Sequence, residues 1–193
     1  DSEIMGLTAL LLLQHARAPA RVVDDSVVLL EDQNRQLWNH ELIAEGLQLV
    51  QRALRLQQLG PYLDEAAIAA THSQAMRAED TDWEQIDQLY ECLEQLQPSP
   101  IITLNRAVAV NKLRGPAAAL DMIQPLEQQL GGYFYFFGVR GVLLAQLGRT
   151  AEARTAFDRA ISLANTAAEA AHIRSQLDRL LASPAATPPA RPH

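Results

Sequence analysis

The side chains that could perform chemistry are few, and their spacing fits no common catalytic pattern. The five histidines stand at positions 15, 40, 72, 172 and 193, so no two have the i,i+4 spacing that a zinc-binding HExxH helix requires. The single cysteine, Cys92, follows Glu91, and a thiol among acidic residues is a poor nucleophile. No glycine-rich loop precedes a Lys-Ser or Lys-Thr pair, which argues against a P-loop. The sequence therefore predicts a protein that is not an enzyme and uses no cofactor.

One group of carboxylates could hold a metal. Asp24, Asp25, Glu31 and Asp32 could offer oxygen ligands to a divalent cation, but they lack the ligand spacing and the glycine of an EF-hand loop. We therefore expect solvated turn acids and no metal site. A metal-dependent enzyme that uses this acidic loop, residues 24–32, is the less favoured alternative, and a calorimetric metal titration separates the two.

Two further groups are candidates for protein binding. Glu84, Asp87, Glu91 and Glu94 recur at spacings of three and four along a predicted helix, so they line one edge. No basic residue lies between Arg77 and Arg106. We expect these four carboxylates to be exposed, either as a solvated face or as a contact surface for a basic partner.

The second group lies in a predicted loop and combines both signs of charge with an aromatic residue. It consists of Glu31, Asp32, Asn34, Arg35 and Trp38. One interpretation is a docking edge for another domain, where Arg and Trp are favoured anchors. The other is that Trp38 belongs to the core and that Asp32 or Asn34 caps a short turn. The sequence leaves both open.

Composition favours a helical fold. The 193 residues include 31 Ala and 30 Leu, 48% are hydrophobic and 20% are charged. The net charge of −7 makes the chain a poor nucleic-acid binder on its own. The longest uninterrupted apolar stretch, residues 9–13, is far too short to cross a membrane.

Hydrophobic spacing and breaker residues predict one helical domain over residues 1–182 and a disordered Pro/Ala tail over 183–193. Ser2 is the expected N-cap of a first helix that is apolar on more than one side, and His72 is expected to pack in the core. Residues 20–38 are expected to form a long non-helical loop, with a short extended hairpin near residues 22–30. The predicted helices cover residues 2–17, the stretch between Asn39 and Gly60, and residues 62–77, 82–97, 101–114, 117–130, 133–147, 150–164 and 166–182.

An internal repeat refines the fold class. The segment from Gly148 to Ala160 resembles the second half of a tetratricopeptide (TPR) repeat, with Gly141 at the small helix-crossing position and Phe157 as the plug. Gly115 stands 33 residues before Gly148, close to the repeat period. This resemblance implies an all-α, TPR-like α-solenoid of antiparallel helix pairs. Its register places Asn105 and Lys112 in a groove, with Arg106 beside them.

Longer stretches of the chain resemble the C-terminal extension of a group of extracytoplasmic-function (ECF) RNA polymerase sigma factors. The matching blocks are residues 6–21, Val28–Arg35, Trp38, Leu42-Ile43, Gly60–Tyr62, Ala67–Ala70, His72, Ala78–Trp83 and Leu104–Val110. Asn34 departs from the aspartate expected there. In this family the extension follows a sigma core that binds promoter DNA and polymerase, and that core is absent from these 193 residues.

The resemblance implies a bacterial, cytoplasmic, regulatory domain. It would modulate transcription initiation by contacting its own sigma core, RNA polymerase or a signalling partner, with no direct DNA binding by this fragment and no membrane contact. The opening Asp1-Ser2-Glu3 lacks an initiator Met and a basic signal-peptide region, so we expect a fragment of a longer, non-secreted protein. The first alternative is a free-standing TPR-like scaffold with no sigma core, and the metal-dependent enzyme is the alternative from another class.

Overall fold

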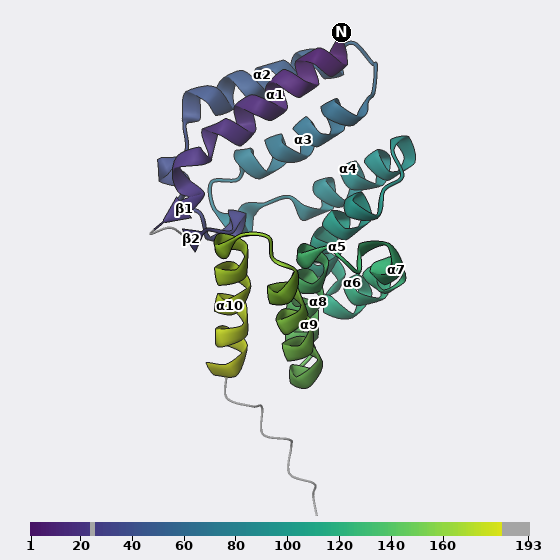
Figure 1. The fold of residues 1–193 in the computed structure, drawn as a ribbon. Helices are drawn as coiled ribbons and strands as arrows, with labels where there is room; N and C mark the ends of the chain where they lie inside the picture. The colour runs from purple at the N-terminus through teal and green to yellow at the C-terminus, as the bar shows by residue number, and fades with distance from the viewer. Residues whose placement is uncertain (24–25, 183–193) are drawn as a thin grey trace, which may run out of the picture. The chain divides into compact units, whose positions relative to one another are not determined.

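The computed structural model describes residues 1–23 and 26–182, which are predominantly α-helical (Figure 1). The predicted all-α class is confirmed. The chain divides into two compact units, Asp1–Gly115 (unit 1) and the part that begins at Pro116 (unit 2). The boundary falls inside the region that the sequence predicted as one domain. The predicted disordered tail, residues 183–193, lies outside the described residues, and so does the acidic pair Asp24-Asp25.

Unit 1 is built from helices that pack mainly on their neighbours in sequence. Its α-helices are α1 (Ser2–Ala16), α2 (His40–Leu54), α3 (Pro61–Gln74), α4 (Trp83–Leu96) and α5 (Pro100–Arg114). Helix α1 packs on both α2 and α3, α3 also packs on α4, and α4 packs on α5. Figure 1 shows α1, α2 and α3 side by side.

The connection between α1 and α2 has the predicted non-α-helical character. Strands β1 (Val22–Val23) and β2 (Ser26–Val27) pair antiparallel, with Val22 opposite Val27, and confirm the short hairpin. Single 3-10 turns occupy much of the remainder. These are η1 (Ala18–Ala20), η2 (Leu30–Asp32) and η3 (Arg35–Leu37), and a further one, η4 (Ala78–Asp80), precedes α4.

Polar side chains mark where the helices begin. Asn39 caps α2 as predicted, because its side-chain oxygen accepts hydrogen bonds from the N–H groups of Glu41 and Leu42, each at 3.1 Å. The predicted N-cap of α1 is wrong by one residue. Asp1 accepts the N–H of Glu3 at 2.9 Å, whereas Ser2 is already helical and buried.

Helix α3 obtains its N-terminal cap from a distant residue. It begins at Gly60-Pro61, which supplies no capping side chain. The Glu3 carboxylate of α1 accepts the N–H groups of Tyr62 at 3.3 Å and Leu63 at 3.1 Å instead. A carboxylate at this position satisfies N–H groups that have no partner within the helix, and the helix dipole favours its charge.

The packing of α1 on α3 requires a glycine at the contact. A Cβ atom added at Gly6 would lie 2.7 Å from the backbone nitrogen of Leu63 and 2.8 Å from its Cα. The facing stretch of α3 is rich in alanine and buried: Ala66, Ala67, Ala69 and Ala70. Small residues on both helices therefore let the two backbones approach closely.

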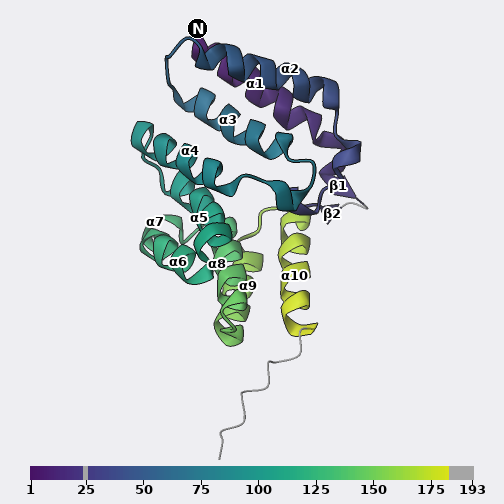
Figure 2. The same ribbon diagram turned by 180° about the vertical axis from the view of Figure 1, so that it is seen from behind.

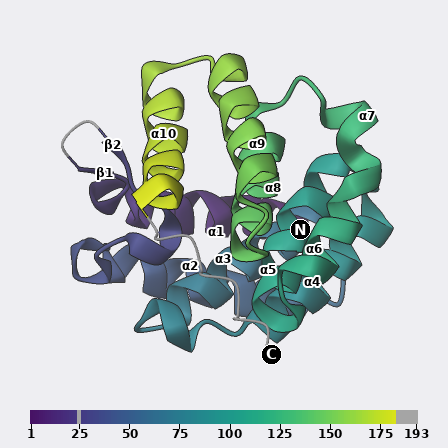
Figure 3. The same ribbon diagram turned by 90° about the horizontal axis from the view of Figure 1, so that it is seen from below.

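Unit 2 contains the segment that resembles a TPR repeat. Its helices are α6 (Pro116–Ile123), η5 (Gln124–Leu126), α7 (Glu127–Leu130), α8 (Phe134–Gln146), α9 (Thr150–Leu163) and α10 (Ala167–Ala182). Helix α8 packs on α6 and on α9, and α9 packs on α10; Figure 3 shows α9 beside α10. The predicted continuous helix over 117–130 is wrong, because it breaks into 3-10 geometry at Pro125, which has no N–H to donate within a helix.

Replacing Gly6 with alanine tests the close approach of α1 and α3. Alanine gains about 1 kcal/mol in helix propensity over glycine. The clash is with backbone atoms, which cannot rotate away, so we expect a net destabilisation of about 1–3 kcal/mol. Urea unfolding followed by circular dichroism measures it. Gly132→Ala is the control, because nothing lies within 4 Å of its added Cβ. A Gly6→Ala protein as stable as its parent would contradict the packing.

Candidate functional site

Arg35 and Trp38 of the predicted docking edge are used inside unit 1. The Nη1 group of Arg35 donates hydrogen bonds to the carbonyl oxygens of His72 at 2.8 Å and Ala75 at 2.9 Å. The last carbonyls of a helix lack partners within it, so Arg35 caps the C-terminal end of α3. Trp38 is only 4% exposed, and the Arg35 guanidinium carbon lies 4.5 Å from its ring centroid. The structure thus supports the core interpretation for these two residues.

The other members of that edge lie nearer the surface. Asn34 accepts the N–H of Gln36 at 3.0 Å and caps η3, as the second interpretation expected. Glu31 and Asp32 are exposed in η2. The Glu31 carboxylate forms an ion pair with Lys112 of α5 at 2.7 Å. The fold therefore joins two residues that sequence analysis had assigned to different surfaces.

The contacts of Lys112 continue toward the end of α3. Its Nζ lies 5.7 Å from the ring centroid of Trp83, a cation–π contact. The Trp83 ring in turn meets the His72 ring edge to face, with 5.3 Å between centroids. His72 is half-buried, in line with the predicted packed histidine. Lys112 is thus engaged with residues of its own unit rather than presented to a peptide.

The acidic edge of α4 faces basic residues of α5, and we call this group the Arg106 network. Figure 2 shows α4 and α5 side by side. The Nε of Arg106 lies 2.7 Å from Asp87 Oδ1, and its Nη1 lies 2.8 Å from Glu94 Oε2. Its Nη2 lies 3.3 Å from Glu91, and Arg114 binds the second Asp87 oxygen at 2.6 Å. Two cations therefore offset three carboxylates.

The expectation that all four carboxylates of the edge are exposed is wrong for Asp87, which is only 6% exposed. The Glu94 side chain is also largely covered, at 21% exposure, whereas Glu84 and Glu91 are exposed. The acidic edge looked unpaired in the sequence because no basic residue lies between Arg77 and Arg106. The helical hairpin brings Arg106 and Arg114 back onto α4.

The two arginines leave the network with one excess negative charge, and Oε1 of Glu94 is buried without a hydrogen-bond partner. Burial lowers the pKa of Arg106, but the hydrogen bonds that Arg106 donates to Asp87 and Glu94 outweigh burial and hold this pKa above its ordinary value. Arg106, which the sequence placed beside the groove, is charged and pairs with Asp87, Glu91 and Glu94. Its neighbour Asn105 is half-buried on α5.

Helix α1 exposes an apolar face that sequence analysis missed. Ile4, Leu7 and Leu11 are 67%, 38% and 61% exposed. Their spacings of three and four place them on one side of the helix, opposite the buried side that packs on α2 and α3. The uniform hydrophobicity of this helix predicted burial on more than one side, and the structure leaves this side uncovered within unit 1. We call Ile4, Leu7 and Leu11 the α1 face.

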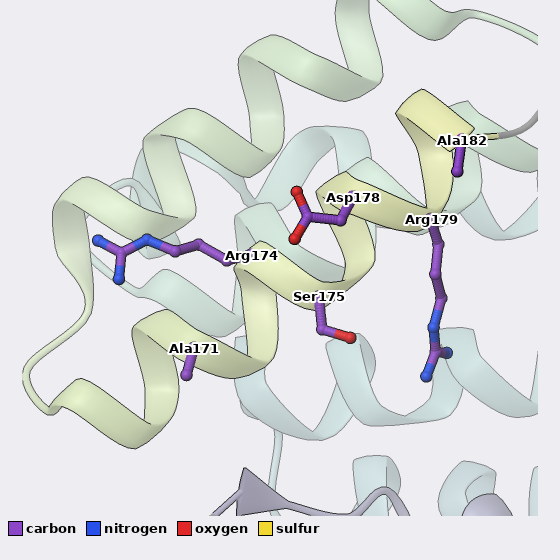
Figure 4. Close-up of a pocket in the computed structure, with 6 residues that line it drawn as sticks. All are labelled: Ala171, Arg174, Ser175, Asp178, Arg179 and Ala182. Atoms are coloured by element: carbon purple, nitrogen blue, oxygen red, sulfur yellow. The ribbon is translucent and has the colours of Figure 1, made fainter.

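The other surface features are weaker candidates for a binding site. A pocket on unit 2 is lined by six residues that all belong to α10 (Figure 4): Ala171, Arg174, Ser175, Asp178, Arg179 and Ala182. Within residues 1–23 and 26–182, no three His, Cys, Asp or Glu side chains gather as a metal ion would require. Every helix in the same described ranges is too short or too polar to cross a membrane.

Comparisons with known proteins match the N-terminal part of unit 1 to a family and nearly the whole chain to a longer relative. Residues 1–54, which include the α1 face and the Glu31–Trp38 block, match a family described as a family of unknown function (DUF6596). The chain is 61% identical over 186 residues to the uncharacterized protein R00370 of Rhizobium meliloti (strain 1021). That alignment covers 96% of this chain but 44% of the relative, so the chain spans less than half of the relative's length. No solved structure matches the chain.

Removing the central carboxylate of the Arg106 network should destabilise unit 1. Asp87→Ala leaves two arginines without their shared acceptor, and breaking a buried ion pair costs about 3–5 kcal/mol. Glu84→Ala, on the same helix but exposed, should stay within about 0.5 kcal/mol of the parent. Urea unfolding of both variants measures the difference. Equal stability of the two variants would show that the network does not hold α4 against α5.

Proposed function

We propose that this chain is a regulatory protein-interaction domain of an ECF sigma factor, with a TPR-like arrangement of its helices. It acts by binding rather than by catalysis, and it modulates transcription initiation through contact with the rest of its own protein, and thereby with RNA polymerase. The observation that carries this proposal is the exposed α1 face in a chain that spans 44% of its relative.

The helix packing of unit 2 supports the TPR-like part of the proposal. A Cβ atom at Gly141 of α8 would lie 2.6 Å from the Phe157 ring of α9, so glycine there admits the plug. Ala153 and Ala160 of α9 are completely buried. Gly148 turns the chain between the helices with φ of +72°, a value that favours glycine. These contacts support the TPR-like part of the proposal, because the repeat resemblance implies the same residues at the helix crossing and the turn.

The physical case for a protein partner rests on the α1 face. Its three large apolar side chains lie in one helical row. A partner that covers them removes apolar surface from water, and the full burial of each side chain contributes about 1.5–3 kcal/mol to the free energy of binding. Such a row is the usual anchor pattern when a helix packs into an apolar groove. The charged alternatives are weaker, because Asp87 and Arg106 are already paired with each other.

The occupant that we favour is the remainder of the longer protein. The homologous region makes up less than half of R00370, so a partner surface could be present in the same polypeptide. A covalently linked partner binds at high effective concentration, so a face of modest area is sufficient for regulation.

The first experiment tests the sigma-factor identity with the full-length protein. Purified full-length protein is mixed with bacterial core RNA polymerase, and association is measured by size-exclusion chromatography and promoter-dependent run-off transcription. We expect a stable complex and specific transcripts. Absence of association with polymerase would overturn the sigma-factor proposal.

The second experiment tests the α1 face with Ile4→Gln/Leu11→Gln. Glutamine keeps the helix propensity high, and both positions are exposed, so the stability of the isolated chain should change little. Binding to the separately expressed remainder of the protein should weaken about 10- to 100-fold, equivalent to about 1.4–2.8 kcal/mol. Met76→Gln is the matched control, because Met76 is 80% exposed and lies outside this face. Equal affinity of the double variant and the control would exclude the α1 face as the contact.

A further inference from the structure

Two arginines converge on one glutamine at the C-terminal end of α1. The Gln14 side-chain oxygen accepts a hydrogen bond from Arg17 Nη2 at 2.6 Å and another from Arg21 Nη2. Arg21 Nη2 also donates to the Gln14 backbone carbonyl at 2.9 Å. A neutral amide oxygen thus holds two positive charges close together, although it neutralises neither.

A third arginine, Arg35, joins this group through the packing of η3. The N–H of Asn39 donates to the carbonyl of Ala16 at 2.9 Å and fixes the end of the η3 segment against α1. Arg35 itself is bound to the C-terminal carbonyls of α3, and its charge acts electrostatically on Arg17. Arg17, Arg21 and Arg35 form what we call the arginine cluster.

The arginine cluster has no carboxylate partner within the described part of the chain. Ion pairs link other arginines to acids there, but none involves Arg17, Arg21 or Arg35. Asp80, whose charge acts on Arg35 from η4, is itself bound by Arg77 through two hydrogen bonds of 2.9 Å. Buried charges in proteins are normally paired, and residues 1–23 and 26–182 supply no carboxylate that pairs with this cluster.

Two buried donors in the same region also lack acceptors. Arg17 is only 8% exposed, and its Nε has no hydrogen-bond partner. The indole Nε1 of Trp38, in the ring under Arg35, is likewise buried without a partner. Unsatisfied buried donors are rare and destabilising in folded proteins, so they need an explanation.

The electrostatics of this region favour an anion. Burial, followed by the charges of Arg21 and Arg35, lowers the pKa of Arg17 to about 10. Burial, followed by the charges of Arg17 and Arg35, lowers the pKa of His72 to about 4. His72 is therefore neutral at pH 7, and the three guanidinium groups carry the positive charge of this region.

We propose that Arg17, Arg21 and Arg35 form a binding site for a phosphate-type oxyanion. Arg17 is the buried member, and the half-buried Arg21 and Arg35 give access from solvent. Guanidinium groups bind phosphate through parallel charge-assisted hydrogen bonds. A tetrahedral dianion offers acceptors in several directions and offsets more of three positive charges than a carboxylate does.

Titration of the ¹⁵N-labelled full chain with inorganic phosphate, at constant ionic strength, tests this proposal. The chain has two tryptophans, Trp38 and Trp83, so two indole N–H signals are expected, and Trp83→Phe assigns them. We expect a saturable shift of the Trp38 indole signal. A linear drift equal to that produced by sodium chloride would overturn the proposal.

Matched variants separate the cluster from general charge effects. Arg21→Gln should weaken phosphate binding at least about tenfold, because it removes charge-assisted hydrogen bonds. Arg52→Gln, an exposed arginine on α2 with the same charge change, should leave the affinity unchanged. Equal weakening by both variants would overturn the site. Circular dichroism confirms that each variant is folded.

Two further arms identify the class of anion. Acetate should bind much more weakly than phosphate, and equal affinity would overturn the assignment to a phosphate-type group. Asp24→Asn/Asp25→Asn tests whether the chain's own carboxylates fill the cluster. Phosphate affinity within about threefold of the parent supports a ligand site, whereas an affinity at least about tenfold higher in this variant would overturn it.

Discussion

The two ends of α3 need hydrogen-bond partners, and charged side chains from elsewhere in unit 1 supply them. Glu3 binds the N–H groups at the first turn, and Arg35 binds the carbonyls at the last turn. The helix itself is rich in alanine, so each residue buries little apolar area and close packing must compensate. The two caps hold α3 between the start of α1 and the η3 turn. Arg35, which supplies one cap, also lies over the buried Trp38 ring and belongs to the arginine cluster, and α1, which supplies the other cap, carries the α1 face.

Other charged side chains of unit 1 also bind residues of the same unit. Arg106 and Arg114 hold α4 against α5 through Asp87, and Lys112 holds the end of α5 near η2 through Glu31. Residues that looked like recognition groups in the sequence are therefore mainly intramolecular contacts. The surfaces that we propose for binding differ from these: the apolar α1 face for a protein partner, and for a small anion the arginine cluster, which forms no ion pair among the described residues.

Local signals in the sequence were sufficient for much of the fold. Asn39 and Asp82 stand at the starts of two predicted helices, and both act as caps because a short polar side chain can accept a backbone N–H. Pro125 carried the information that the helix over 117–130 must break, but the surrounding helix formers obscured it. The hairpin near residues 22–30 was recognisable from two valine pairs around an acidic turn.

The candidate sites depend on contacts between distant residues, which a single sequence does not display. Asp87 read as an exposed acid because its partners lie 19 and 27 residues further along the chain. Helix α1 read as buried because hydrophobicity alone does not tell which side lacks a neighbour. The sequence offered one signal for an exposed apolar side. Ile4, Leu7 and Leu11 form a second row of large apolar residues, opposite the buried side, which consists mostly of small residues.

The most direct test of this division of roles is a methyl NMR comparison of two proteins. Under the proposed function the chain is part of a longer protein. The isolated chain and that longer protein, with only this chain labelled at Ile and Leu methyl groups, are recorded under the same conditions. We expect large shifts at Ile4, Leu7 and Leu11, and unchanged signals at Ile86 and Leu93 of α4. Shifts confined to α4, with the α1 face unchanged, would contradict the account.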